Sequence, residues 1–432
     1  MKRIILSVIT FILSFIVVHS QDIQNNSVEI KNYRRCATTE YMKKQKAINS
    51  SLEKQIQQIE EFTQQWIKNN PTESKDKTII TIPVVVHVVY YNSAQNIPDG
   101  RINEQITILN NDYGKLNTHS MGVFDPNLKV DTELRFCLAK RTPTGVYTTG
   151  IVRKQTTVNG FTDNDKVKHT SQGGSDQWNP NKYMNIWVCN FSEDGLCGYA
   201  QFPSSPLDNN YGVVINYKYF GLSGYQNAPY NLGGTTSHEI GHCFNLYHIW
   251  GDDYGSCTGS DMCNDTPNQA EATYGNNSGL LTDACSGAPK GIMYMNFMDY
   301  SNDITYSNFT PNQKSRIQAL FTTGGPLVSL KSSNGCTPGI GAGIDETKDI
   351  GDFNIYPNPT TGSINVSLAL VNTGDVTITV SNLLGEIISK VEKQKISSIN
   401  IPIDISTQSS GIYYVKIQTA SETLTKKISL VK

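Results

Sequence analysis

Three of the seven histidines of this 432-residue chain lie in one short segment, HEIGHCFNLYH at 238–248. On a helix, His238 and His242 are four residues apart and project from the same face. Two imidazole nitrogens placed in this way can reach one zinc ion at roughly 2.0–2.1 Å. Glu239 lies about a third of a turn around the helix, beside the ion, where it can polarise a zinc-bound water and carry its proton. The segment therefore requires a fold that holds this helix against a metal site.

The third histidine reaches the same ion only if the helix ends before it. His248 follows His242 by six residues, well over one helical turn. Asn245 lies between them, and asparagine adopts the left-handed conformation more readily than any residue except glycine. We expect a sharp helix end at Asn245. Three protein ligands leave the fourth zinc position open, as catalysis requires. A surface helix with two hydrated histidines is the alternative for HExxH alone, and His248 argues against it.

The N-terminus carries an export signal. Two basic residues precede an apolar run over 4–18, and small residues at 18–20 fit cleavage before Gln21. Because the run is short and no similar run follows, residues 1–20 are expected to be a secretory signal peptide rather than a membrane anchor. The net charge of −2 and the absence of a basic run argue against nucleic acid or anionic membrane as the main partner.

Nine cysteines in an exported chain predict disulfides, with one thiol left over. Spacing alone does not give their connectivity. None forms a CxxC pair, which argues against a structural zinc knuckle.

Composition divides the chain into five parts. Residues 21–77 are polar and contain a helix that Ser50-x-x-Glu53 is expected to open as a capping box. This part is expected to be a removable pro-segment, with a helical spacer as the alternative. The remaining parts are expected to be a catalytic domain at 78–330, a linker at 331–352 and an all-β sandwich at 353–432.

The extended motif HExxHxxNxxH, followed by Met298 in NFMDY, resembles a metzincin, a clan of zinc endopeptidases. The segments HEIGHCFNLYHIWGDD, CNDTPNQ, NFMDYSND and FTPNQKSRIQALF resemble the pappalysin family, particularly its bacterial cytophagalysin- and ulilysin-like branch. The similarity runs through most of 78–325. Most metzincins have glycine where this chain has Asn245, and the conformational argument above indicates that asparagine is tolerated.

The resemblance implies roles for residues outside the histidine segment. Met298 would form a hydrophobic base under the zinc ligands, and Tyr300 would donate its phenol to the oxyanion of the tetrahedral intermediate. An ordinary core methionine and a packed aromatic are the alternatives. Gly198, Tyr199 and Ala200, in LCGYAQFP, resemble the edge strand on which such enzymes lay an extended substrate.

The resemblance also implies calcium, a disulfide and a specificity residue. Calcium would bind at positions that match those of relatives, with a solvated acidic loop as the alternative; these are Asp253, Asp261, Asn264 and Thr266. Cys257 and Cys285 match a family disulfide that would clamp this loop, whereas Thr305 replaces a cysteine of a second family bridge. Relatives often prefer a basic residue after the scissile bond, and Asp303, beside Ile304, is the candidate acidic residue.

Cys36, in RRCATTEY, is a candidate latency switch. Its thiolate could occupy the open zinc position of the precursor, and removal of the pro-segment would leave eight cysteines. A disulfide from Cys36 into the catalytic domain is the alternative.

The C-terminal part resembles the sorting domain of type IX secretion cargo in Bacteroidetes. The residues that carry this resemblance are YPNPTTG at 356–362, GIYYVKI at 411–417 and the final KKISLVK. Such a tail directs a protein to the outer-membrane secretion machinery and is then usually removed. A carbohydrate- or matrix-binding sandwich is the alternative.

The sequence as a whole predicts an α+β metzincin-like catalytic domain, a mixed twisted sheet plus the active-site helix, followed by a small all-β sandwich. The predicted function is secreted, zinc-dependent hydrolysis of protein or peptide substrates, with Glu239 as general base and acid, by a monomer. The alternative is a secreted adhesin or binding protein with a structural zinc site, which would need neither Glu239 nor Tyr300.

Overall fold

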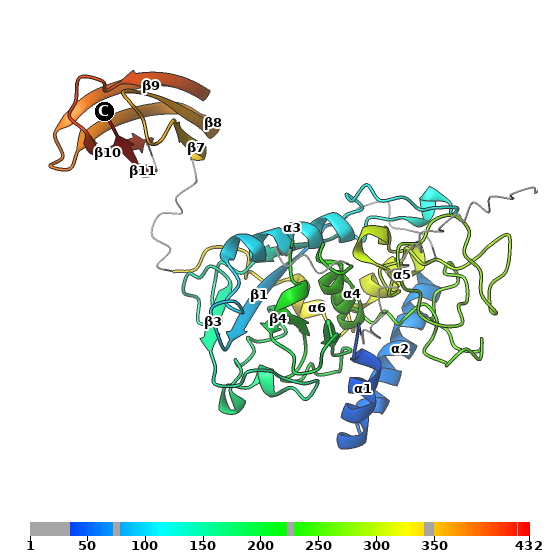
Figure 1. Ribbon diagram of the computed structural model, residues 1–432. Coiled ribbons are helices and arrows are strands. Elements are labelled where there is room, and N and C mark those ends of the chain that lie inside the picture. The colour runs from blue at the N-terminus through cyan, green and yellow to red at the C-terminus, as the bar shows by residue number, and fades with distance from the viewer. Residues whose placement is uncertain (1–34, 72–77, 223–228, 341–349, 421) are drawn as a thin grey trace, which may run out of the picture.

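The computed structural model describes residues 35–71, 78–222, 229–340, 350–420 and 422–432. The predicted signal peptide, 1–20, lies outside these ranges. Two separate sheets form, a larger one before the predicted linker and a smaller one after it (Figure 1). No helix within the described ranges carries an apolar stretch long enough to cross a bilayer.

The larger sheet is mixed, as predicted. Its strands run in the order β2-β1-β4-β6-β5, with β3 also paired to β1. Every pair is parallel except β5–β6, so the edge strand β5 runs against its neighbour. The bounds are β1 Ile80–Tyr90, β2 Leu134–Leu138, β3 Ile151–Gln155, β4 Met184–Cys189, β5 Gly198–Ala200 and β6 Val213–Asn216.

The helices α3 (Asp99–Tyr113), α4 (Gly234–Cys243) and the short α6 (Val328–Lys331) pack on this sheet, and α5 (Pro311–Leu320) packs against α2 (Leu52–Asn69). Every residue of α4 is buried, and apart from its two histidines and Glu239 the helix carries only small or apolar residues. A capping box opens α5, because Thr310 Oγ1 accepts from Gln313 N and the Gln313 side chain accepts from Thr310 N.

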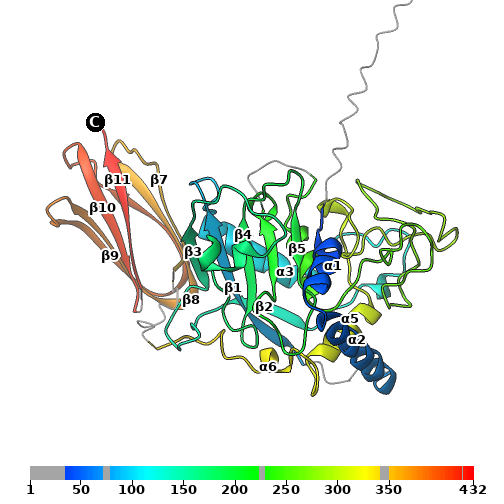
Figure 2. The ribbon, with the colours of Figure 1, turned by 90° about the horizontal axis from the view of Figure 1, so that it is seen from below.

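Two helices of the predicted pro-segment cover one end of this unit. Helix α1 (Thr38–Ile48) lies beside β5, and α2 (Leu52–Asn69) lies beside α5 (Figure 2). The predicted capping box at Ser50 is wrong. Helix α2 has Ser51 at its N-cap without a side-chain cap, since Asn49 Oδ1 accepts from Ser51 N in the preceding turn.

A partly buried ion pair joins α2 to α5. Arg316 Nη1 and Nη2 each donate to one oxygen of the Glu60 carboxylate, at 2.8 and 2.7 Å. Arg316 Nη2 also donates to the carbonyl of Asn245, at 2.9 Å. The second pro-segment helix is therefore connected, through one arginine, to the predicted bend after the metal-binding helix.

The cysteines form fewer bridges than the sequence suggested. Cys257–Cys285 is present, and a second bridge joins Cys137 to Cys336. Five cysteines are free and buried, not one; these are Cys36, Cys189, Cys197, Cys243 and Cys263. Their burial in separate parts of the structure keeps most of them from pairing.

Both ends of the predicted linker, 331–352, contact neighbouring elements within the described residues. The Cys137–Cys336 bridge ties its first part to the larger unit, where Ile340 also pairs with Val146. Strand β7 (Ile350–Tyr356) already begins within its last three residues.

The smaller sheet is all-β, as predicted, and antiparallel throughout, in the order β11-β10-β8-β7 with β9 also paired to β8. Its other strands are β8 Ser363–Asn382, β9 Ile387–Asp404, β10 Gly411–Gln418 and β11 Thr423–Leu430. Strands β8 and β9 are long, and each continues through an irregular stretch marked by register shifts around Gly374.

Candidate metal centre and substrate cleft

The three histidines meet at one point. His238 and His242 project from α4, and Asn245 has a φ of 63°, which confirms the left-handed bend that the sequence predicted. His242 Nε2 lies 3.1 Å from both His238 Nε2 and His248 Nε2. Two nitrogens bound tetrahedrally to one zinc are about 3.3 Å apart, so the spacing fits a shared ion.

Hydrogen bonds at the other ring nitrogens fix the tautomers. His238 Nδ1 donates to the carbonyl of Phe297 at 2.7 Å, and His242 Nδ1 donates to that of Leu246 at 2.8 Å. The Nε2 lone pairs therefore face each other without a proton between them, an arrangement that needs a cation. Burial lowers the pKa of both His238 and His242 well below its usual value, which keeps these imidazoles neutral for ligation.

The orienting partner of the third histidine is a residue that the sequence analysis missed. His248 Nδ1 lies 2.9 and 3.0 Å from the two oxygens of Asp252, and Trp250 stacks on the His248 ring with centroids 4.2 Å apart. A carboxylate in this position orients a metal-binding imidazole and raises its basicity. The spacing of four residues from His248 to Asp252 was the available signal.

Glu239 lies beside the histidines with one oxygen unused. Its Oε2 accepts from Thr38 Oγ1 at 3.0 Å and from Cys36 Sγ at 3.4 Å. Its Oε1 is buried and has no hydrogen-bond partner among the described residues. Burial raises the pKa of Glu239 to about 8, a value suited to a group that takes and returns a proton near neutral pH.

Met298 and Tyr300 both contact this centre. A Cβ added to Gly241 would lie 2.5 Å from Met298 Sδ, so the thioether packs directly against the metal-binding helix where that helix lacks a side chain. Tyr300 Oη lies 3.2 Å from His248 Nε2 and 3.3 Å from the carbonyl of Cys36.

The edge strand pairs with the pro-segment. Cys36 bridges Gly198 in parallel orientation, with Ala37 N donating to the Gly198 carbonyl at 3.0 Å. Ala200 N donates to Thr38 Oγ1 at 2.9 Å. The free edge of β5 therefore binds an extended backbone, as expected of a strand that accepts peptide by β-augmentation.

Cys36 lies within the histidine cluster. Its Sγ is 3.6 Å from His242 Nε2, and the ligand atoms of Cys36, His238, His242 and His248 all lie within 4.8 Å of one another. Cys36 is not disulfide-bonded, so the alternative bridge is absent from the structure. Burial and the Glu239 carboxylate raise the pKa of the Cys36 thiol, whereas a metal ion would deprotonate it.

Asp303 is fully buried and holds a pro-segment cation. Arg35 Nη2 lies 3.3 Å from Asp303 Oδ1, and the guanidinium lies between two rings, 4.3 Å from the Tyr230 centroid and 4.6 Å from that of Tyr306. Asp303 Oδ2 also accepts from Gly234 N, at the start of α4, at 3.2 Å. Asp303 was a candidate from its sequence position, whereas no local pattern indicated Arg35, the neighbour of Cys36.

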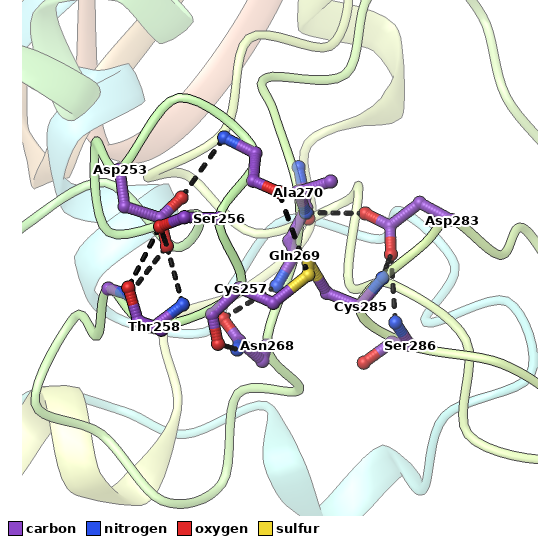
Figure 3. Close-up of a disulfide and its surroundings, with 12 residues drawn as sticks. Asp253, Ser256, Cys257, Thr258, Asn268, Gln269, Ala270, Asp283, Cys285 and Ser286 are labelled. Atoms are coloured by element: carbon purple, nitrogen blue, oxygen red, sulfur yellow. Dashed lines mark hydrogen bonds between the residues drawn. A yellow bond between two sulfur atoms is a disulfide. The ribbon is translucent and has the colours of Figure 1, made fainter.

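The predicted calcium residues do not converge through the contacts that the structure shows. Asp253 accepts from backbone amides and Ser256 within its own turn, near the Cys257–Cys285 disulfide (Figure 3). Asp261 instead accepts from Thr266 Oγ1 at 2.8 Å. Within the described ranges, the only group of three or more His, Cys, Asp or Glu ligand atoms is the Cys36 and histidine cluster.

Histidines whose lone pairs meet at one point, beside a buried carboxylate with a free oxygen, define a metal-dependent hydrolase. The neighbouring sheet edge, which already binds an extended backbone, indicates that its substrate is a peptide.

Comparisons with known proteins agree with this class. A family model described as pregnancy-associated plasma protein-A matches residues 167–322. An extracellular metalloprotease of Pyricularia oryzae is 30% identical over 261 residues, covering 58% of this chain and 78% of that protein. Mature mirolysin of Tannerella forsythia, solved in complex with a cleaved peptide, is 44% identical, has a TM-score of 0.57, and covers 59% of this chain and 96% of its own. A promirolysin mutant from the same organism is 39% identical, has a TM-score of 0.62, and covers 69% of this chain and 97% of its own.

The chain belongs to the pappalysin family of zinc metalloproteases. A second family model, described as a secretion system C-terminal sorting domain, matches residues 354–431. The protein is therefore a secreted metalloendopeptidase that reaches the cell surface or the exterior, as predicted, and the alternative of an adhesin or binding protein is not favoured. The larger coverage by promirolysin than by mature mirolysin agrees with a zymogen.

Proposed function

We propose that this protein is a latent endopeptidase in which Glu239 is the general base and acid, and in which His238, His242 and His248 hold zinc. The observation that carries the proposal is the free, buried Oε1 of Glu239 beside three Nε2 atoms that face one another. Zinc bound by these histidines would act as a Lewis acid and lower the pKa of the attacking water.

Other side chains and the edge strand have separate roles in proton transfer, oxyanion stabilisation and substrate binding. Glu239 takes the proton of the attacking water and returns it to the leaving amine, because its free Oε1 lies beside the histidine cluster. Tyr300 donates its phenol to the oxygen that becomes negative, and Met298 supports the helix beneath the ligands. Gly198, Tyr199 and Ala200 bind the substrate backbone along the sheet edge.

A Glu239→Ala variant tests these roles. It should keep zinc and its fold but lose activity on casein by at least about 100-fold, since general base catalysis contributes on the order of 10²–10⁴. A Tyr300→Phe variant should retain more activity than Glu239→Ala. Equal casein degradation by Glu239→Ala and the parent would refute the mechanism.

Cys36 supports a thiolate lock in the precursor. Its sulfur lies among the ligand atoms, and the pro-segment backbone that carries it is paired with β5. Cys36→Ala should give a precursor that cleaves peptide before processing, whereas Cys189→Ala, which removes another buried thiol, should stay latent. Full latency of Cys36→Ala would exclude the lock.

Asp303 supports a preference for arginine after the scissile bond. Arg35 occupies a site with one carboxylate and two aromatic faces, a combination that fits a planar guanidinium better than an ammonium. Peptides with arginine in this position should be cleaved faster than matched lysine or alanine peptides, and Asp303→Asn should reduce the difference. A mature enzyme without an arginine preference would contradict the assignment. Mirolysin, whose structure contains a cleaved peptide, is a suitable reference enzyme.

The domain boundaries predicted from the sequence are also part of the proposal. They comprise a signal peptide at 1–20, a pro-segment at 21–77, a catalytic domain at 78–330, a linker at 331–352 and a sorting domain at 353–432 that engages the outer-membrane secretion machinery. Calcium at Asp253, Asp261, Asn264 and Thr266 would raise the melting temperature of the parent but not of Asp261→Asn. Sedimentation of the purified chain tests the predicted monomer.

A further inference from the structure

A second side chain of the pro-segment is completely buried in the larger unit. Tyr41, on α1, has no exposed surface, and its ring lies 4.8 Å from that of Tyr199, a residue of β5. Phe161, Phe191 and other buried apolar side chains of the larger unit form one cluster with it. Tyr41 therefore fills a pocket that belongs to the peptidase rather than to the pro-segment.

The end of this pocket is built to bind a hydroxyl group. Tyr41 Oη lies 2.8 Å from both Asp165 Oδ2 and Gln201 Oε1, so its proton has two acceptors. Lys168 neutralises Asp165 at 2.8 Å and lies 5.2 Å from the centre of the Tyr41 ring. With the pro-segment in place these three polar side chains are at most 5% exposed, and Gln45 Nε2 also donates to Asp165 Oδ2 at 3.0 Å. An apolar occupant would leave Gln201 Oε1 without the phenol donor.

The pocket adjoins the substrate edge. Tyr199 belongs to β5, and Gln201 directly follows this strand. From Cys36 to Tyr41 the chain is extended and then helical, which spans no more than about 11 Å. An extended substrate covers this distance in roughly three or four residues.

We propose that this pocket is a tyrosine-binding subsite of the mature enzyme and lies on the opposite side of the metal centre from Asp303. Tyr41 fills the pocket only while the pro-segment is in place. The inference rests on the proposed endopeptidase function. Asp303 binds Arg35 on one side of Cys36, and the pocket binds Tyr41 on the other side, so the pro-segment marks two substrate-binding positions. A preferred substrate carries tyrosine about three or four residues from the scissile bond.

Three matched peptides test the proposal with the zinc-loaded chain after its pro-segment has been removed by processing. All three peptides have arginine directly after the scissile bond. They differ only at the third and fourth positions before this bond, where the first has tyrosine, the second phenylalanine and the third alanine. The tyrosine peptide should have a kcat/KM about tenfold above that of the phenylalanine peptide, because only the phenol supplies the missing donor. In Gln201→Met, which removes one of the two acceptors and leaves Asp165, this ratio should fall severalfold.

Lys166→Ala is the control, because Lys166 is exposed on the same loop and should leave the ratio at its parental value. Equal rates for tyrosine and phenylalanine in the parent, or the same ratio in Gln201→Met, would overturn the subsite. Cleavage of the alanine peptide reports the peptidase itself, so a failed subsite is distinguishable from a failed endopeptidase.

A second measurement uses the latent chain, which does not depend on the substrate position. Tyr41→Phe removes only the hydroxyl and should increase the rate of pro-segment release about tenfold, measured by activity onset at a fixed protease concentration. Release at the parental rate would show that the polar end of the pocket binds no phenol, and would refute the proposal.

Discussion

Gly198 lies where the edge strand approaches the catalytic glutamate most closely. A Cβ added there would be 2.9 Å from Glu239 Cγ, 3.0 Å from Glu239 Oε1 and 3.0 Å from the Val214 carbonyl oxygen. Ordinary contacts between such atoms are about 3.5–4.0 Å, so Glu239 or the strand must move by roughly 0.5 Å or more. Misplacement of a reacting group by about 1 Å can cost on the order of 10²-fold in rate. We therefore expect Gly198→Ala to lower kcat by about 10- to 100-fold while zinc stays bound.

Activity on an arginine-containing peptide and zinc content by atomic absorption measure this effect separately. Gly100→Ala is the matched control, because nothing lies within 4 Å of a Cβ added at Gly100. Backbone strain does not enter, since Gly198 lacks the positive φ that would disfavour alanine. A Gly198→Ala enzyme with kcat within twofold of the parent would refute the steric argument.

Three further predictions concern zinc affinity and stability. Asp252→Asn should weaken zinc binding by about 10- to 100-fold in a chelator competition, because the carboxylate orients His248; unchanged affinity would contradict this role. Replacing Cys137 and Cys336 with serine should lower the free energy of unfolding by roughly 2–5 kcal/mol in a urea titration, since the bridge closes a loop with a sequence separation of 199, and an unchanged midpoint would argue against it. Burial raises the pKa of Asp261 to about 7, so its contribution to stability is present below about pH 4 and is lost as the pH rises through 7. Asp261→Asn should flatten this part of the pH dependence, and identical slopes for parent and variant would disprove it.

The histidine segment could be interpreted from sequence because its local pattern determines its structure. The bend at Asn245 is predictable for the same reason, since it depends on the conformational preference of one residue. The extent of β8 and β9 was not predictable, because cross-strand pairing carries both strands through stretches of low local preference. The Cys137–Cys336 bridge joins residues far apart in sequence, a contact that spacing alone does not reveal.

The zinc-binding histidines and Glu239 could be predicted from their sequence motif. The contacts that the predicted pro-segment makes with the rest of the chain could not be predicted in this way. Arg35, Tyr41 and Glu60 each contact a partner more than a hundred residues away, and no local pattern pairs them. Asp252 is intermediate, because its spacing from His248 was visible but its role depends on the direction of the chain after the bend. Short sequence segments therefore predict local backbone conformation, but they do not predict which distant segments pack together.

The five unpaired thiols require that this exported protein folds before it meets an oxidising environment. Each is buried in the folded chain, and an oxidising environment offers every exposed thiol the opportunity to form a wrong bridge. The native pattern of two bridges and five thiols therefore survives only if these cysteines are shielded before oxidants reach them. Refolding of the denatured chain should consequently succeed in a reducing buffer followed by oxidation, and should give mispaired species when the two steps are reversed.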